Sequence, residues 1–562
     1  MNMLSAFKKK RYHYFIGLFL FSYLYSQPNM GGVGWLVPSN IALWFSSTIV
    51  VVLAAFKVWQ TQKINYSLFN TLLGLLLLGI YGFGIIRSHL DYQELLFYFL
   101  LLLNVWLFFL ALFQFLLTVK IFNKLLFFIV VLGVLQAAIG LIQYFDHQQI
   151  FYILFGYEPF AINGRPTGSF QQVNMMSSFL AVSLLAVLYL ITIKSKVLVT
   201  SKTRFFLLFL SMFIFTVFFL TESRAGLVAL IGGLVTFLIV NFRVIKPRFG
   251  YFLVWLLIAG LTALLTSLIL QYTVVDSTAV SSTVLSKFER VAAGNDVRMD
   301  LYISAIKLFM QSPFLGYGIG NYDPVMVQFY SHLTPSPELK AILGNITHPH
   351  NELLFWMLQS GVITLILVIA FIYFYIKGLF NNKRKIIALF LLIPIVIHSQ
   401  LSFPFILSSL HLFLFLILLA FGSTRVKSYS FHVDKSKVIK ISLLPIIIGY
   451  FSLTSLLAYS MFNSIEEIYY YQKRLFLHKQ SEYAGKESNG YFYFASKNPL
   501  TRPFIRQEMN RMFDKAIEQG NKYDINQYVL WSEKNAYSED VDKERLLKAL
   551  TLGKLNNNAA NK

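Results

Sequence analysis

Apolar runs long enough to cross a lipid bilayer recur along the chain and are separated by short polar connections. A helix needs about 20 apolar residues to span the roughly 30 Å of hydrocarbon in a membrane. The pattern therefore predicts an all-α polytopic membrane protein with about 13 transmembrane helices. The predicted segments are residues 12–26, 39–56, 67–86, 94–119, 125–145, 174–193, 205–221, 225–242, 251–271, 352–376, 386–403, 405–422 and 439–461.

Lysine and arginine are concentrated in every second connection, as the positive-inside rule expects for cytoplasmic loops. The short alternate connections hold only Arg87, Arg165 and Arg224. This asymmetry predicts a cytoplasmic N-terminus and places these three arginines outside. The even-numbered connections hold Lys57, Lys63, Lys120, Lys124, Lys194, Lys196, Lys202, Arg204, Arg243, Lys246, Arg248, Lys377, Lys383, Arg384, Lys385, Arg425, Lys427, Lys435, Lys437 and Lys440.

Composition agrees with a membrane protein and excludes several other classes. The 562 residues are 56% hydrophobic and only 13% charged, whereas soluble proteins carry roughly 25% charged residues. The net charge of +22 could indicate nucleic-acid binding, but the basic residues follow the cytoplasmic loops instead. The absence of cysteine excludes disulfides, thiol chemistry and cysteine metal sites. The basic start, Lys8 to Arg11, precedes an apolar run without a small-residue cleavage site, which predicts an uncleaved signal anchor.

Two long polar segments interrupt this regular pattern. Residues 272–350 form a large outward loop within a transmembrane domain that covers residues 1–462. Residues 463–562 hold 13 of the chain's 26 acidic residues together with 16 basic ones, and apolar residues recur there at helical spacing. This tail is predicted to be a soluble helical domain on the same outer side. Loops of such length are usually functional.

The large loop ends in Thr347-His348-Pro349-His350-Asn351-Glu352, which opens an apolar helix predicted from Leu353 toward Tyr375. One interpretation is a capped helix start, with Asn351 as the N-cap and Glu352 in the first turn. The other is catalytic, because an imidazole accepts a proton near neutral pH. Pro349 favours an extended conformation for His348, which is therefore expected to point away from His350.

Two outward arginines precede this loop. Arg165 lies in Asn163-Gly164-Arg165-Pro166-Thr167-Gly168-Ser169-Phe170-Gln171-Gln172-Val173-Asn174, a segment whose glycines and proline break both neighbouring helices. Arg224 lies in Thr221-Glu222-Ser223-Arg224-Ala225-Gly226, a turn at the membrane boundary. A charge there must be paired, snorkelled or functional. Pairing between Arg224 and Glu222 is the structural alternative.

Within the large loop, a helical spacing places Asp300, Ser304, Lys307 and Gln311 on one face and mainly apolar residues elsewhere. This predicts an amphipathic helix on the membrane or over a cavity. The following segment, Ser312 to Tyr322, is rich in glycine. It lacks the lysine and the strand–helix context of a phosphate-binding loop, so a tight turn is predicted.

The outward arginines suit a pyrophosphate group, because a guanidinium binds phosphate oxygens with two parallel hydrogen bonds. No nucleotide-binding motif occurs on the cytoplasmic side. An enzyme that acts outside therefore needs a donor that carries its own activation, as a lipid-linked pyrophosphoryl sugar does. Arginines would stabilise the leaving pyrophosphate, and a histidine would take the proton of the attacking hydroxyl.

The chain resembles the O-antigen ligase and polymerase superfamily. The likeness rests on Gly164-Arg165 with Gly168-Ser169-Phe170 and Asn174, on Ser223-Arg224-Ala225-Gly226, on Pro313 to Gly318, and on His350-Asn351-Glu352 with Gly361. It covers roughly residues 130–425. The N-terminal Gln27-Pro28-Asn29, Gly34-Trp35 and Pro38-Ser39, the His348-to-Glu352 form of the loop and the extra tail are similar to protein O-oligosaccharyltransferases, the PglL-like pilin glycosylation ligases.

This resemblance implies a metal-independent glycosyltransferase without cofactors in the bacterial inner membrane, with the active site and the C-terminal domain in the periplasm. Its donor would be an undecaprenyl-pyrophosphate-linked oligosaccharide, transferred en bloc to a Ser or Thr hydroxyl of an exported, pilin-like protein. His350 would be the general base, and Arg165 and Arg224 would bind pyrophosphate. The second-rank site residues are Arg298, Tyr302, Asn321, Asn351, Glu352, Gln172 and Asn174.

Other interpretations stay open. An O-antigen ligase to lipid A core, or a polymerase of glycan repeats, would use the same arginines and histidine. A flippase or transporter for the lipid-linked glycan would also have many spans and intramembrane arginines. His348, His350 and Glu352 could form a metal triad, although an extended segment does not readily bring them together. His13, His398 and His411 are predicted to be packing or interfacial residues.

Overall fold

The structure is a computed structural model that describes residues 17–25, 37–90, 92–115, 118–145, 165–193, 200–273, 297–330, 348–380, 386–423, 426–430, 445–456 and 458. Four predictions lie outside these residues: the signal anchor's basic start, the Gln27-to-Trp35 signature, much of the 272–350 loop, and the domain at 463–562.

Eight helices among the described residues are long and apolar enough to cross a membrane, and shorter apolar helices accompany them. This makes the chain an all-α polytopic membrane protein. The count of 13 spans stays a prediction. The long helices are α2 (Pro38–Thr61), α4 (Tyr92–Gln114), α5 (Val119–Tyr144), α7 (Val173–Thr192), α8 (Ser201–Leu220), α9 (Arg224–Ile245), α10 (Phe249–Thr273) and α16 (Val362–Phe380). The shorter ones are α3 (Leu68–Gly84), α17 (Leu389–Leu401), α19 (Ser409–Gly422) and residues 445–456.

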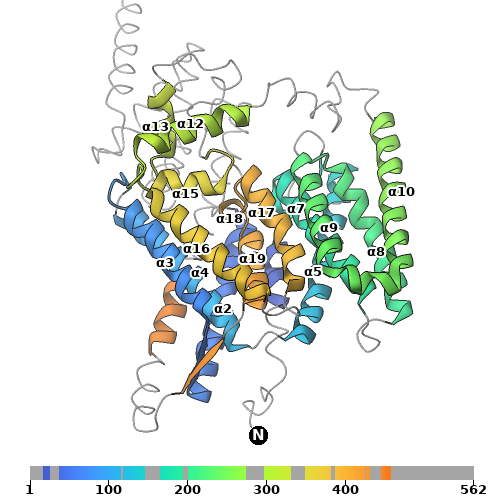
Figure 1. Ribbon diagram of the computed structural model, residues 1–562, viewed down its shortest axis with the longest axis horizontal. Helices are drawn as coiled ribbons and strands as arrows, with labels where there is room; N and C mark the ends of the chain where they lie inside the picture. Colours follow the sequence, from blue (N-terminus) through green and yellow to red (C-terminus); the bar gives the residue numbers. More distant parts are fainter. Residues whose placement is uncertain are drawn as a thin grey trace, which may run out of the picture.

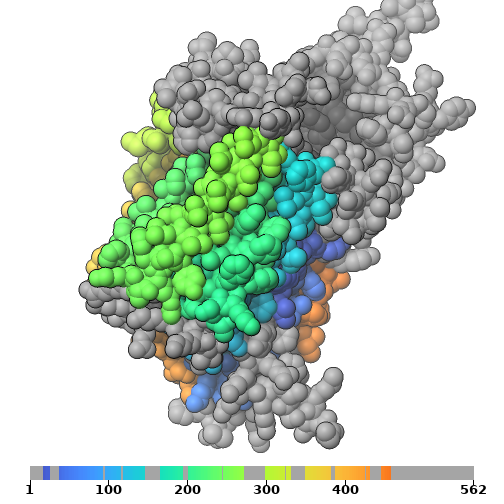
Figure 2. Space-filling model, turned by 90° about the vertical axis from the view of Figure 1, so that its right-hand side faces the viewer, coloured from blue at the N-terminus to red at the C-terminus, as the bar shows by residue number. Residues whose placement is uncertain are grey.

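Helix α7 forms the centre of the bundle, since its whole apolar length is buried. It packs against α5, α8, α9 and α17 (Figure 1). Gly226 lets α9 approach closely, because a Cβ there would collide with Ser177 of α7. By contrast, α10 lies at the edge of the bundle over α8 (Figure 2) and exposes Leu257, Leu261 and Leu264. Such an apolar outer surface suits contact with lipid.

The predicted single helix over 352–376 is wrong, because the chain breaks at Gly361. Helix α15 (Glu352–Ser360) ends there and α16 begins at Val362. Gly361 has a φ of 74°, and a Cβ would collide with the carbonyl oxygen of Phe314. The Val362 amide donates to Pro313 O at 2.7 Å. The break therefore depends on a distant turn that packs against it.

At one end of the bundle, basic connections predicted to be cytoplasmic lie together. Strand β1 (Lys63–Tyr66) pairs antiparallel with β2 (Lys427–Ser430), with Lys63 opposite Ser430, and both strands escaped sequence prediction. Gln114, at the end of α4, accepts from Asn65 N at 2.9 Å. Arg204 and Arg248 both donate to the carbonyl of Ile193, just after α7. Basic connections that are far apart in the sequence thus lie at the same end of the helix bundle.

At the opposite end, hydrogen bonds link described residues that lie in or directly beside the six connections predicted to face outward. This separation of the two sets of connections agrees with the topology expected from charge, although the orientation relative to the cell stays a prediction. The bonds run from Ser39 Oγ to Ser169 O, Asn40 Nδ2 to Leu407 O, Arg87 Nη1 to Ser312 Oγ, Ser223 Oγ to Asn174 Oδ1, and Phe405 N to Glu352 Oε2.

Helices α12 (Val297–Gln311) and α13 (Tyr322–Tyr330) form a cap that packs with α15 at this end (Figure 1). The helix predicted over residues 300–311 is confirmed, but its faces were only partly predicted. Leu301, Ala305 and Leu308 are buried as expected of an apolar face, whereas Ser304 is also buried and Ile306 is 50% exposed. Ser304 is satisfied in the core by donating to Asp300 O at 2.7 Å and by its contact with Tyr330 OH.

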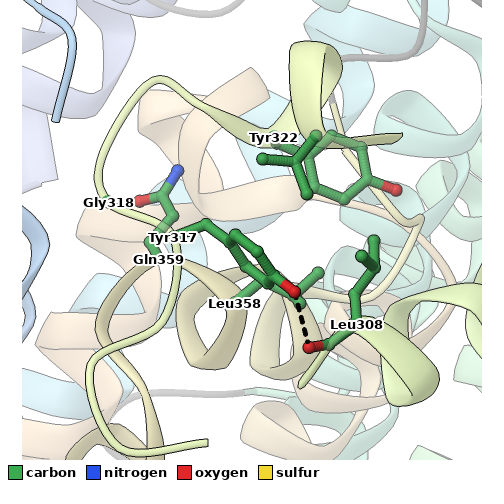
Figure 3. Close-up of a pocket in the computed structure, with 7 residues that line it drawn as sticks. Leu308, Tyr317, Gly318, Tyr322, Leu358 and Gln359 are labelled. Carbon is green, nitrogen blue, oxygen red and sulfur yellow. Dashed lines mark hydrogen bonds between the residues drawn. The ribbon is translucent and has the colours of Figure 1, made fainter. Parts of the chain in front are cut away.

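The turn predicted after α12 is confirmed, with positive φ values at Gly316, Gly318 and Gly320. Figure 3 shows Tyr317 beside a small pocket, with its hydroxyl donating to Leu308 O at 3.0 Å. The pocket's walls are mostly apolar and come from α12, this turn, α13 and α15. None of the predicted arginines or histidines lines it, so it is not the site of the expected chemistry.

Candidate functional site

His350 has an unusual backbone conformation. Among the described residues, four non-glycine residues have positive φ: Gln62, Gln171, Glu222 and His350. The first three follow the ends of helices, where a left-handed residue is common. His350 instead precedes the N-cap of α15, with a φ of 55°. Left-handed residues without such a local explanation gather at functional sites, where surrounding contacts hold them in place.

Those contacts come from α12 and α17. The hydroxyl of Tyr302 lies 3.2 Å from His350 O and 3.0 Å from Gln400 O. Asn351 caps α15 as predicted, with Oδ1 accepting from Leu354 N at 3.0 Å. Its Nδ2 reaches Gln400 O at 3.3 Å and Gln400 Oε1 at 3.2 Å. Gln400 was missed by the sequence prediction. It bonds directly to the N-cap residue Asn351, and it shares the hydroxyl of Tyr302 with the carbonyl of His350.

The prediction that His348 points away from His350 is wrong. The two rings lie 4.5 Å apart, centroid to centroid, and His348 stacks on Phe403 at 4.5 Å. Pro349 restricts only the local backbone, whereas the stacking partner is more than 50 residues away. Burial, and secondarily the neighbouring His350, lower the pKa of His348 to about 3. His348 is therefore a neutral neighbour that shapes the surroundings of His350.

Glu352 is buried at the start of α15, and its Oε2 accepts from Phe405 N at 3.2 Å. Burial raises the pKa of its carboxyl to about 8, against the opposing effect of the hydrogen bond from Phe405. The side chain is thus mainly protonated at pH 7. The acidic residue next to the histidine segment adds little negative charge there, which favours an anionic ligand.

The segment that carries Arg165 is held by two glutamines of α5. Gln143 Oε1 accepts from Thr167 N at 3.0 Å and from Gly168 N at 2.8 Å. Gln136 accepts from Ser169 N at 3.0 Å and donates to Ser169 Oγ at 2.6 Å. Two polar residues seven apart on an apolar helix share one face. That spacing was a usable signal, which the sequence prediction did not exploit.

Arg224 is the first residue of α9, directly after the N-cap Ser223. Ser223 Oγ accepts from Gly226 N at 3.1 Å and donates to Asn174 Oδ1 at 2.7 Å. This second bond joins the Arg224 turn to the start of α7, nine residues after Arg165. A cation is electrostatically unfavourable at a helix N-terminus. An arginine retained at this position is consistent with anion binding.

The remaining second-rank residues differ in their surroundings. Arg298 lies one turn before Tyr302 on α12 and interacts electrostatically with His398 of α17. Gln172 is the N-cap residue of α7 and has a buried Oε1 without a hydrogen bond among the described residues. Asn321 donates to Arg87 O at 2.6 Å and to Tyr317 O at 2.7 Å, so its amide holds the glycine-rich turn.

These contacts define a class of protein. The chain is a multi-pass membrane protein whose arginine- and histidine-bearing segments lie at the end of the bundle opposite the paired basic loops. Within the described part of the chain, no three His, Cys, Asp or Glu side chains are grouped to hold a metal ion.

Comparison with known families narrows this class. Residues 206–369, which include Arg224 and His350, match the family model described as O-antigen ligase. Residues 386–536, which include Gln400, match the model described as virulence factor membrane-bound polymerase, C-terminal. Both matches support a likeness to the O-antigen ligase superfamily and indicate a membrane glycan ligase or polymerase. No curated protein and no solved structure matched the chain.

Proposed function

We propose that this protein transfers a glycan en bloc from an undecaprenyl-pyrophosphate carrier to a Ser or Thr hydroxyl of an exported, pilin-like protein. The observation that supports this most strongly is the left-handed His350, held by Tyr302 and Asn351 at the same end of the bundle as the two arginine segments. The two family matches agree with a glycan ligase or polymerase.

In the proposed reaction, the acceptor hydroxyl oxygen attacks the anomeric carbon of the first sugar. The new C–O bond forms while the bond from that carbon to the pyrophosphate oxygen breaks. His350 takes the hydroxyl proton, and undecaprenyl pyrophosphate leaves as the anion. Arg165 and Arg224 offset the charge that develops on the leaving oxygens. No metal ion takes part in this scheme.

The electrostatics of the segments suit this donor. Arg224 stands at the N-terminus of α9, so its charge and the helix dipole both favour an anion. Glu352 is mainly neutral at pH 7 and therefore competes little with a bound pyrophosphate for the arginines. Guanidinium groups also stay charged in partly dry surroundings, where a lysine can lose its proton.

A second candidate differs only in the acceptor. The match of residues 386–536 to a membrane-bound polymerase model favours a sugar hydroxyl, as in polymerisation of glycan repeats. Transfer to lipid A core is the corresponding ligase reaction. The C-terminal tail, which we propose selects a protein acceptor, separates the candidates. Its deletion should reduce transfer to protein and leave any sugar transfer unchanged.

The deciding experiment reconstitutes the purified chain in liposomes with lipid-linked oligosaccharide and offers a purified pilin, lipid A core or a second lipid-linked glycan. We expect glycosylated pilin, with or without EDTA. His350→Asn should abolish transfer, because asparagine tolerates the left-handed conformation but does not accept the proton. His89→Asn, at an exposed outward histidine, is the control and should retain transfer.

Four outcomes would contradict the proposal. Wild-type activity in His350→Asn would exclude His350 as the base. Transfer to a glycan or lipid A core alone would establish the second candidate. Translocation of the lipid-linked glycan without any transfer would indicate a transporter. A loss of activity with EDTA that added metal restores would refute the metal-free scheme.

A further inference from the structure

A chain of buried polar side chains runs through the middle of the bundle, apart from the residues already assigned. Ser178 of α7 contacts two imidazoles, with its Oγ 2.7 Å from His398 Nδ1 and 2.8 Å from His411 Nε2. His411 Nδ1 lies 2.8 Å from Ser408 Oγ, and Tyr23 OH lies 3.2 Å from the same oxygen. All five side chains are fully buried. Such a series is costly inside a membrane and is usually functional.

One arrangement of the protons fits all of these contacts. In it, the Ser178 hydroxyl donates to Met175 O at 3.1 Å and both imidazoles donate to Ser178 Oγ. His411 then has a lone pair on Nδ1, which accepts from Ser408 Oγ. Ser408 in turn accepts from Tyr23 OH. All of these bonds form with both histidines uncharged, and His398 Nε2 is buried without a hydrogen-bond partner among the described residues, so the series suits a fixed arrangement rather than a buried charge.

One end of this series reaches the histidine segment. His398 lies in the last turn of α17, and its carbonyl accepts from Ser402 N at 2.8 Å. Gln400, two residues after His398, bonds to Asn351 Nδ2 and Tyr302 OH, which hold His350. The contact with Ser178 holds His398 in place and thereby holds Gln400 two residues later. Gln400 in turn holds the segment that carries His350.

The other end reaches the arginine segment. The carbonyl of Tyr23 accepts from Ser169 Oγ at 2.9 Å, and Ser169 lies four residues after Arg165. Phe170 packs on the ring of Tyr23 at 4.8 Å and on His411 at 5.6 Å. The same buried side chains thus touch the supports of both halves of the proposed site.

We propose that Ser178, His398 and His411 are positioning residues of the transferase site, which hold the Arg165 segment and His350 at a fixed separation. The inference rests on the proposed function and extends it to buried residues near the ends of α7, α17 and α19. A small displacement of His350 relative to the acceptor hydroxyl slows the chemical step more than it weakens donor binding, because proton transfer needs close alignment.

The test compares three variants with a matched control in the reconstituted transfer assay. Ser178→Ala removes the shared oxygen, and His398→Leu removes the ring. His398→Asn keeps a side-chain amide that can donate where Nδ1 does. Ser183→Ala is the control, because Ser183 is equally buried on α7 and donates only to Ile129 O at 3.3 Å.

We expect Ser178→Ala and His398→Leu to lower kcat at least about tenfold, with the donor KM changed less than about twofold. His398→Asn should retain most of the kcat, and Ser183→Ala should match wild type. If these residues only stabilised the bundle, their substitution would lower the amount of folded protein and leave the kcat of the folded protein unchanged. Wild-type kcat in both damaging variants, or equal losses in His398→Leu and His398→Asn, would overturn the proposal.

A second measurement needs no activity. Hydrogen exchange of the Leu354 and Phe355 amides, which bond to Asn351, reports whether the histidine segment is held. We expect faster exchange there in Ser178→Ala and wild-type exchange in Ser183→Ala. Unchanged exchange in Ser178→Ala would refute the positioning role. A wild-type protein without transfer activity would refute the proposed function alone, and the exchange result would still decide the inference.

Discussion

Glu352 gives the protein a pH dependence that its substitution should remove. Burial raises the pKa of this carboxyl from its ordinary 4.5 to about 8. At about 1.4 kcal/mol per pKa unit, the folded state favours the neutral carboxyl by about 5 kcal/mol. Between these two pKa values the folded chain binds more protons than the unfolded chain, so stability falls as the pH rises.

The effect is confined to a measurable range. It is fully present below about pH 4.5, decreases through neutral pH and is lost above about pH 8. Between pH 6 and 9 the free energy of unfolding should fall by about 3 kcal/mol. Glu352→Gln keeps an oxygen that accepts from Phe405 N but does not titrate, so its stability should stay constant over this range.

Thermal unfolding followed by tryptophan fluorescence measures this directly, because Trp356 lies one turn after Glu352 on α15. The unfolding midpoint of the wild type should fall from pH 6 to pH 9, and that of Glu352→Gln should not. Asp300→Asn, at a carboxyl that is not fully buried, controls for general charge effects. A wild-type midpoint that is constant with pH, or a parallel fall in Glu352→Gln, would refute the reasoning.

Three further predictions concern the supports of the site. Arg165→Lys keeps the positive charge but loses the planar guanidinium group, so glycan transfer should be lost. Arg87→Lys, on the same side, should retain transfer. Equal turnover in the two variants would exclude bidentate binding by Arg165. Gly361→Ala forces a Cβ toward Phe314 O at a φ of 74° and should lower the free energy of unfolding by at least about 1–3 kcal/mol. Gly82→Ala should not lower the free energy of unfolding, because a Cβ at this position meets open space. Equal unfolding midpoints in the two variants would refute the argument. Gln143→Leu leaves Thr167 N and Gly168 N unbonded and should reduce transfer per folded molecule. Gln114→Leu, which loses similar bonds at the other end, should not, and equal activities would contradict a role for Gln143 in holding Arg165.

The parts of the fold that depend on local pattern were predictable. Hydropathy located the apolar helices, and the distribution of lysine and arginine separated the two ends of the bundle. Asn351 was recognised as an N-cap because its role needs only the residues that follow it. In each case the structure is determined by residues close in sequence or by the overall charge of a connection.

The parts that depend on distant partners were not predictable in this way. Glycine is common inside transmembrane helices, and Gly361 breaks its helix only because the Pro313–Phe314 turn packs against it. Strands β1 and β2 have four residues each, and they pair although most of the sequence lies between them. The contact of His348 with His350 likewise depends on Phe403, which arrives from the end of α17.

The candidate site was predictable in its residues but not in its support. Arg165 and Arg224 stand out in sequence because charged residues are rare in the short outward connections, and His350 stands out because it directly precedes a predicted helix N-cap at the end of the large loop. Gln400 does not, because a neutral amide inside an apolar helix has many possible roles, and Gln136 and Gln143 are marked only by their spacing of seven residues on one helix face. Only the structure shows that each amide bonds the backbone or the cap of a segment carrying one of the three residues.

The charges around the site also limit the kind of substrate it can bind. Arg224 adds its charge to the positive end of α9, and Arg298 of α12 interacts electrostatically with His398 of α17. Glu352 supplies little negative charge at pH 7, and an uncompensated positive charge at a membrane boundary is unfavourable. A bound anion offsets such a charge, whereas a neutral glycan does not. If Arg165 and Arg224 bind the donor as we propose, their guanidinium groups can donate to the oxygens of both phosphates, so we expect a pyrophosphate-linked donor to bind better than a phosphate-linked one.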